Sequence, residues 1–266
     1  MTDAITARLD LALDLARATG ELTLSYFRTD DLGTEHKSDR SPVTVADRAA
    51  ETLMRERIAA AFPDDGVLGE EEGEVAGTSG YRWILDPIDG TQSFVCGVPL
   101  FGTLIACEAE GEVVLGVVHC PAAGELVSAA RDRGAWWSVD GGAPRRARVS
   151  RTARLAEASF STTSPQYFPS FDLYRRVAQT ARVTRGWSDC YGHLLVATGR
   201  LDVQLDPSTS IWDDAALMVV VEEAGGRFTD LTGGRRIGGG AAVSTNGLVH
   251  DEVLALRDES RVADPG

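Results

Sequence analysis

Five short apolar segments follow one another in the first half of the chain, and they limit the possible folds more than any other feature. Turn sequences such as AEGE and PAAGE separate them, which is typical of β-strands joined by tight connections. The segments are residues 66–68, 81–85, 104–109, 113–119 and 126–130. This succession predicts a meandering β-sheet.

Two amphipathic helices are predicted before this sheet. Ile5, Leu9 and Ala16 recur at helical spacing, with charged residues between them. Residues 45–61 show a second helical pattern, which the pair Phe62–Pro63 ends. A loop rich in Asp, Gly and Ser is predicted over residues 30–42. We expect the two helices to pack together on one face of the sheet.

The second half of the chain alternates strand and helix patterns. Strands are predicted at residues 158–162, 183–186 and 201–205, and helices at 170–181, 190–198 and 215–224. Such alternation indicates α/β layers. We place a domain boundary near Ser150, so that residues 1–150 hold the helix pair and the meandering sheet, and residues 151–266 form an α/β half. Small-molecule sites often lie at an interface of this kind.

Composition excludes some function classes. The formal net charge of -14 argues against a nucleic-acid partner, because binding a polyanion needs clustered Lys and Arg. An anionic ligand would therefore be held by metal ions or backbone N–H groups.

No basic and apolar leader is visible, and no apolar run approaches the roughly 20 residues of a membrane span, so we expect a cytoplasmic protein without a membrane partner. The four cysteines form no CxxC pair and are expected to be reduced and buried.

The stretch WILDPIDGTQSF, which begins at Trp83, places two carboxylates directly after an apolar run. The strand is expected to end at Leu85. Asp86, Asp89 and the carbonyl of Ile88 can then converge on one point, and oxygen ligands suit Mg²⁺, Mn²⁺ or Ca²⁺. The alternative is that Asp89 or Thr91 caps the next helix. This stretch alone does not separate the two interpretations.

Two further acidic elements favour the metal site. Glu70 in LGEEEG follows an apolar pair, and Asp213 stands with Asp214 at the start of the apolar helix in SIWDDAALMVVVEEAGG. A solvated glutamate run and a helix cap are the structural alternatives. Unpaired carboxylates beside a core are unfavourable unless a cation neutralises them. Three such elements in one chain therefore predict a cation site.

These motifs resemble those of a known family. GEE, WILDPIDGT and WDDAA are similar to the ordered motifs of the inositol monophosphatase family, magnesium-dependent phosphomonoesterases, and SPVTVADRAAE resembles the segment ahead of them. The similarity extends over nearly the whole chain. It implies the layered αβαβα sandwich of the inositol monophosphatase and fructose-1,6-bisphosphatase type, and a homodimer. It also implies two or three Mg²⁺ ions, held by Glu70, Asp86, Asp89, Asp213 and the Ile88 carbonyl.

The resemblance also implies roles in hydrolysis of a phosphate monoester. Asp47 and Thr91 would orient and deprotonate a water molecule, with Glu70 beside them in the catalytic set. Gly90 and Thr91 would bind the phosphate through backbone N–H groups at a helix start. Most metal ligands then fall within residues 1–150, whereas Asp213 and the substrate pocket fall within 151–266.

One segment resembles a particular branch of the family. GWSDCYGHLLVATGRLDVQLD is similar to the histidinol-phosphatase branch, which hydrolyses L-histidinol phosphate in histidine biosynthesis. Asp189 and Asp206 would then pair with the amino group of that substrate. The structural alternatives are a helix cap for Asp189 and a turn for Asp206. The functional alternatives are an inositol or sugar monophosphatase and a non-catalytic binding protein.

Overall fold

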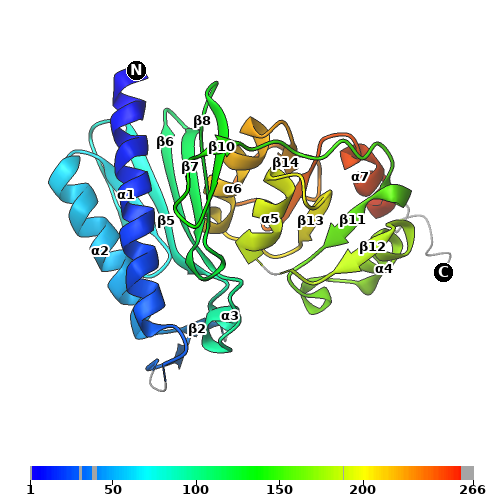
Figure 1. Ribbon diagram of the computed structural model, residues 1–266, viewed down its shortest axis with the longest axis horizontal. Coiled ribbons are helices and arrows are strands. Elements are labelled where there is room, and N and C mark those ends of the chain that lie inside the picture. Colours follow the sequence, from blue (N-terminus) through cyan, green and yellow to red (C-terminus); the bar gives the residue numbers. More distant parts are fainter. Residues whose placement is uncertain (1, 30–31, 38–40, 188, 259–266) are drawn as a thin grey trace.

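The computed structural model describes residues 2–29, 32–37, 41–187 and 189–258. Five layers stack along its long axis (Figure 1). Helices α1 (Thr2–Tyr26) and α2 (Val45–Ala61) cover one face of a large sheet, and α5 (Asp189–Ala197) and α6 (Ile211–Glu223) cover the other. A second sheet follows, with α4 (Phe171–Thr180) and α7 (His250–Asp258) on its far side. The predicted αβαβα sandwich is confirmed.

The large sheet has eight strands in the order β10-β9-β8-β7-β6-β5-β3-β4. Every neighbouring pair is antiparallel except β3 and β5. The strands are β3 (Gly66–Gly69), β4 (Gly73–Val75), β5 (Tyr81–Asp89), β6 (Gly102–Ala109), β7 (Glu112–Cys120), β8 (Glu125–Ala130), β9 (Gly134–Val139) and β10 (Arg145–Arg146). Both edge strands, β4 and β10, are very short and exposed. All five strands predicted in this region are present.

The second sheet is mixed and has the order β12-β11-β13-β15-β14. Strand β11 is parallel to β12 and β13, and the other pairs are antiparallel. The strands are β11 (Ser159–Ser161), β12 (Val183–Arg185), β13 (Val203–Asp206), β14 (Arg227–Thr229) and β15 (Ala242–Thr245). A separate two-stranded ribbon, β1 (Glu35–His36) and β2 (Pro42–Val43), begins within the loop predicted over residues 30–42 and ends one residue beyond it. Residues 30–31 and 38–40 of that loop lie outside the described residues.

Strand β5 does not end at Leu85 as predicted. It continues to Asp89, and its register against β6 shifts between Asp86 and Asp89. Pro87 lies in the irregular stretch, where its missing N–H is tolerated because no regular ladder bond is needed. The carbonyl of Pro87 accepts a hydrogen bond from the Thr103 hydroxyl at 2.9 Å. The strand therefore carries both aspartates to its carboxyl end.

Three of the four apolar clusters among the described residues lie between the layers. The first lies between α1, α2 and the large sheet, and it includes Met54 and Trp83. The central core joins Val118 of β7 to Leu194 of α5 and Val219 of α6. The third lies between the second sheet and α4 and α7. Because residues from both sides of position 150 fill the central core, the two halves pack directly against each other.

Helix α6 approaches the large sheet closely because β7 has a glycine at the crossing. A Cβ added to Gly116 would lie 2.7 Å from the carbonyl oxygen of Ala216 and 2.6 Å from a methyl group of Val219. Any larger side chain would push helix and sheet apart. Gly116 thus fixes the distance between the sheet that carries Asp86 and the helix that carries Asp213.

The cysteines agree with the expectation only in part. All four are free thiols, and Cys107, Cys120 and Cys190 are buried, but Cys96 is exposed. Cys96 follows directly after the short helix α3 (Thr91–Val95). As for membranes, the described helices include none with the length and apolar character needed for a span.

Candidate functional site

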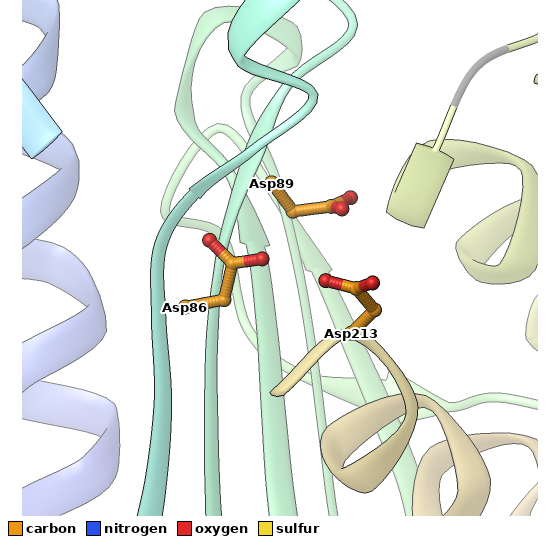
Figure 2. Close-up of side chains that lie close together, drawn as sticks. All are labelled: Asp86, Asp89 and Asp213. Carbon is orange, nitrogen blue, oxygen red and sulfur yellow. The ribbon is translucent and has the colours of Figure 1, made fainter. Parts of the chain in front are cut away.

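Three carboxylates meet between the large sheet and the middle helices. Asp86 and Asp89 come from the end of β5, and Asp213 comes from the first turn of α6 (Figure 2). One oxygen from each lies within 4.8 Å of the others. The structure therefore brings together side chains separated by more than a hundred residues in sequence.

The local structure of each aspartate tests the helix-cap alternatives that the sequence left open. Asp213 does cap its helix, because the Ser210 N–H donates to its Oδ2 at 2.7 Å in a capping box. Asp213 also belongs to the cluster with Asp86 and Asp89. Capping by Asp89 or Thr91 is wrong: Gly90 is the N-cap of α3, with no side-chain cap bond. Asp89 instead accepts a hydrogen bond from the N–H of Cys190 at 2.5 Å.

The electrostatics of the cluster favour a cation. Asp86 is only 1% exposed, and its Oδ1 has no hydrogen-bond partner among the described residues. Burial, together with the charges of Glu70, Asp89 and Asp213, raises the pKa of Asp86. Burial likewise raises the pKa of Asp213 to about 6. A buried carboxylate oxygen without a donor is unfavourable, and all the available ligands are oxygens, so the residues fit a divalent cation such as Mg²⁺.

Glu70 and Ile88 lie next to the cluster. The Glu70 carboxylate lies outside the group of three and pairs with Lys37, whose Nζ is 2.7 Å from Glu70 Oε1 and 2.7 Å from Glu71 Oε1. The Ile88 carbonyl accepts a hydrogen bond from the Thr91 hydroxyl at 3.0 Å. Their roles as metal ligands remain predictions.

Asp47 and Thr91 form a second part of the site. Asp47 is fully buried in the first turn of α2, and its Oδ2 accepts hydrogen bonds from the N–H and the hydroxyl of Thr44 at 2.8 and 2.6 Å. Its Oδ1 lies 3.4 Å from the Thr91 hydroxyl. Burial raises the pKa of Asp47, although the bonds from Thr44 oppose the shift. The cap of α2 thereby fixes one carboxylate oxygen toward α3.

A cavity of about 740 Å³ opens beside the cluster. Residues of both halves line it, including Glu70, Asp89, Asp189, Asp206 and Asp213. The cavity is large enough for a small phosphate ester and is strongly acidic. It contains the predicted substrate residues Asp189 and Asp206 together with three of the predicted metal ligands.

Among the lining residues that sequence reasoning did not identify, two contact Asp206. Both line the cavity: Thr163 donates its backbone N–H to Asp206 Oδ1, and His193 contacts Asp206 Oδ2 through its ring Nε2. The one signal in the sequence was that His193 follows Asp189 by four residues, which places both on one face of a helix.

Comparison with known proteins gives the family of this chain. The inositol monophosphatase family matches residues 6–261. The chain belongs to this family. A histidinol-phosphatase of Chlorobaculum parvum is 44% identical, with 97% of this chain and 99% of that protein covered. A histidinol-phosphatase of Mycobacterium tuberculosis is 46% identical, over 92% of this chain and 96% of the relative.

Solved structures of inositol monophosphatases are similar in fold to this chain. An IMPase of Thermotoga maritima superimposes with a TM-score of 0.85 at 34% identity, covering 96% of this chain and 98% of the other. Because the match spans nearly the full length of both chains, it includes every layer that contributes to the site.

Proposed function

We propose that this protein is a Mg²⁺-dependent histidinol-phosphatase, a phosphoric monoester hydrolase that converts L-histidinol phosphate to L-histidinol and phosphate. The observation that carries the hydrolase assignment is the group of three aspartates beside the cavity, in which the buried Oδ1 of Asp86 has no hydrogen-bond partner within the described part of the chain. The names of the relatives at 44% and 46% identity support the substrate.

Asp86, Asp89 and Asp213 would hold the cation, and Glu70 and the Ile88 carbonyl would complete the coordination of two or three ions. For Glu70 to do so, its carboxylate would have to leave Lys37. When bound, the ions would neutralise the charge of the ester and lower the pKa of water. The aspartates supply negative charge that keeps the ions beside the ester, in a protein whose net charge would otherwise repel it.

Asp47 and Thr91 would orient the attacking water and receive its proton. Thr44 donates two hydrogen bonds to Oδ2 of Asp47, and Oδ1 is the oxygen that faces Thr91. When the Thr91 hydroxyl turns its hydrogen from the Ile88 carbonyl to Asp47 Oδ1, the lone pairs of the hydroxyl oxygen can accept a hydrogen from water. The raised pKa of Asp47, caused mainly by burial, makes its carboxylate a better proton acceptor than an exposed aspartate.

The remaining residues would bind the two ends of the substrate. The N–H groups of Gly90 and Thr91 would donate to the phosphate. Asp189 would pair with the positively charged amino group, since an acidic cavity favours a substrate with a cation at one end. From the family resemblance we further infer a homodimer that works in the cytoplasm, and sedimentation equilibrium of the purified chain tests the dimer.

A substrate panel tests the proposed function. We expect kcat/KM for histidinol phosphate to exceed that for inositol 1-phosphate in the presence of Mg²⁺, and a chelator to abolish both activities. A preference for inositol phosphate would reject the substrate, and activity that survives the chelator would reject the metal. Asp14→Asn removes an exposed carboxylate on α1. It serves as the control variant for Asp→Asn substitutions in the site, because it changes the net charge equally and is purified in the same way.

A further inference from the structure

Protein groups already occupy both oxygens of Asp206. Its Oδ1 accepts hydrogen bonds from the N–H of Thr163 at 2.7 Å and, more weakly, from the Thr162 hydroxyl at 3.4 Å. Its Oδ2 contacts the Gln204 side-chain amide at 2.8 Å and His193 Nε2 at 3.1 Å. The side chain is also buried. A carboxylate with four such partners has little capacity left to bind a substrate amine directly.

These partners connect Asp206 to the first turn of α5. The hydroxyl of Thr163 accepts a hydrogen bond from the N–H of Asp189 at 2.8 Å. His193 lies one turn further along the same helix, and its other nitrogen contacts the Ser244 hydroxyl at 2.6 Å. One carboxylate in the second sheet therefore fixes α5 at two points, through Thr163 and through His193.

Asp189 needs such support for two reasons. Its φ of +51° lies in the left-handed region, which is unfavourable for a residue with a side chain. Its carboxylate also lies close to the metal cluster: Oδ2 would be 2.9 Å from a Cβ built on Gly90, and its charge, after burial, raises the pKa of Asp89. Strain and like-charge repulsion would both move Asp189 away from the cavity.

We propose that Thr163, Asp206 and His193 form a positioning relay that fixes the Asp189 carboxylate in the cavity, and that this relay sets the selectivity for phosphate monoesters bearing an amino group. The inference rests on the proposed function, because it assigns the amine to Asp189. It reassigns Asp206 from amine contact to positioning residue. The relay acts on KM for amine-bearing esters rather than on the hydrolytic step.

The hydroxyl of Thr163 offers the sharpest test. Thr163→Val keeps the shape of the side chain and removes the acceptor for Asp189 N–H, whereas Thr163→Ser keeps the hydroxyl. For Thr163→Val we expect KM for histidinol phosphate to rise about tenfold, the scale of one lost hydrogen bond, with kcat changed by less than about twofold. The selectivity over glycerol 2-phosphate, which has no cation, should fall by the same factor. Thr163→Ser should retain the wild-type selectivity.

A double mutant shows whether the effect passes through Asp189. After Asp189→Asn has removed the charge, adding Thr163→Val should cause no further loss of selectivity. Additive losses would overturn the relay, and so would an equal loss for both substrates or an unchanged selectivity in Thr163→Val. If the valine variant does not fold, Thr163→Ala, which adds no apolar bulk, provides the same comparison.

The two proposals fail in different ways. A wild-type protein that hydrolyses both esters without preference overturns the proposed substrate, and the selectivity role with it. A wild-type preference for histidinol phosphate that survives Thr163→Val overturns the relay alone.

Discussion

At the scale of single residues, a buried carboxylate without a partner is stabilised only when a proton or a cation reaches it. Asp86 is in this position, because no described residue donates to its Oδ1, and because burial, followed by the charges of three other acidic groups, raises its pKa. Stability and ion binding are therefore coupled at this one side chain.

Removing the charge of Asp86 should separate these two effects. We expect Asp86→Asn to raise the melting temperature of the metal-free protein at pH 7.5, since the repulsion within the cluster decreases. The same variant should lose the increase in melting temperature that Mg²⁺ gives the wild type, together with at least about a hundredfold in kcat/KM. Thermal denaturation with and without Mg²⁺ measures the first two effects. A variant that Mg²⁺ stabilises as strongly as the wild type would contradict the site.

The burial of His250, in α7, predicts that the stability of the folded protein depends on pH. The ring is fully buried, between the hydroxyls of Thr229 and Thr245 at 2.9 and 3.0 Å. Burial lowers the pKa of His250 from 6.5 to about 4. Below pH 6.5 the unfolded chain therefore binds a proton that the folded protein does not bind until about pH 4. The stability from His250 is complete above pH 6.5 and is lost as the pH falls toward 4.

The loss expected from His250 is about 3 kcal/mol over this interval. His250→Gln should be less stable than the wild type at pH 7, but its free energy of unfolding should fall less between pH 7 and pH 4. Urea titrations at four or five pH values give the slope of the free energy of unfolding against pH for the wild type and for His250→Gln. Parallel slopes would show that His250 does not cause the decline.

At the scale of elements, the turn from β5 into α3 depends on Gly90. Its φ is +81°, and an added Cβ would meet the Asp189 carboxylate at 2.9 Å. Gly111, in the turn between β6 and β7, has a φ of +83°, and no atom of the described residues lies within 4 Å of an added Cβ. The two glycines share the same backbone strain and differ in their surroundings.

This pair provides a matched comparison. We expect both Gly90→Ala and Gly111→Ala to lose about 1 kcal/mol of stability from the left-handed backbone. Only Gly90→Ala should also lower kcat/KM, by at least about tenfold, because it displaces Asp189 and the start of α3. If Gly111→Ala lowers kcat/KM as much, the effect comes from backbone strain and not from the site.

The sequence predicted elements well where the boundary signals are local. The bounds of α2 match because Thr44 caps its start and Phe62–Pro63 ends it. Strand β5 was predicted too short, because Pro87 normally ends a strand and the irregular register that accommodates it depends on β6. Strands β14 and β15 were missed. They are three and four residues long and depend on pairing with each other and with β13.

Some residues of the candidate site could be predicted from local sequence signals, and others could not. Asp86, Asp89 and Asp213 could be selected because each follows or begins an apolar segment and belongs to a recognisable motif. Thr163 could not, because its contacts depend on the order of strands in the second sheet, which no local pattern gives. Asp206 was selected, but the occupation of both its oxygens is a property of the folded structure.

At the scale of the whole molecule, the central core joins the two halves of the chain. Val118 of β7 packs in the same core as Leu194 and Val219 from the middle helices. Neither half would bury its share of this core alone. We therefore expect a single cooperative unfolding transition, with tryptophan fluorescence and far-UV circular dichroism giving coincident curves.

The contact at Gly116 tests this cooperativity. Gly116→Val should lower the free energy of unfolding by about 1 to 3 kcal/mol, because it forces α6 away from β7. The two spectroscopic curves should shift together to lower urea. Curves that separate in the wild type or in the variant would show that the halves unfold independently.

The short outer strands of the large sheet have a consequence for assembly. Strand β10 consists of two exposed arginines, and β4 has three exposed residues. Short edge strands with charged residues expose few backbone groups to which another polypeptide could hydrogen-bond. They therefore protect against intermolecular strand addition and fibril growth. If two copies of this chain associate, their contact must therefore be built from side chains on other surfaces and not by extending this sheet from one copy into the next.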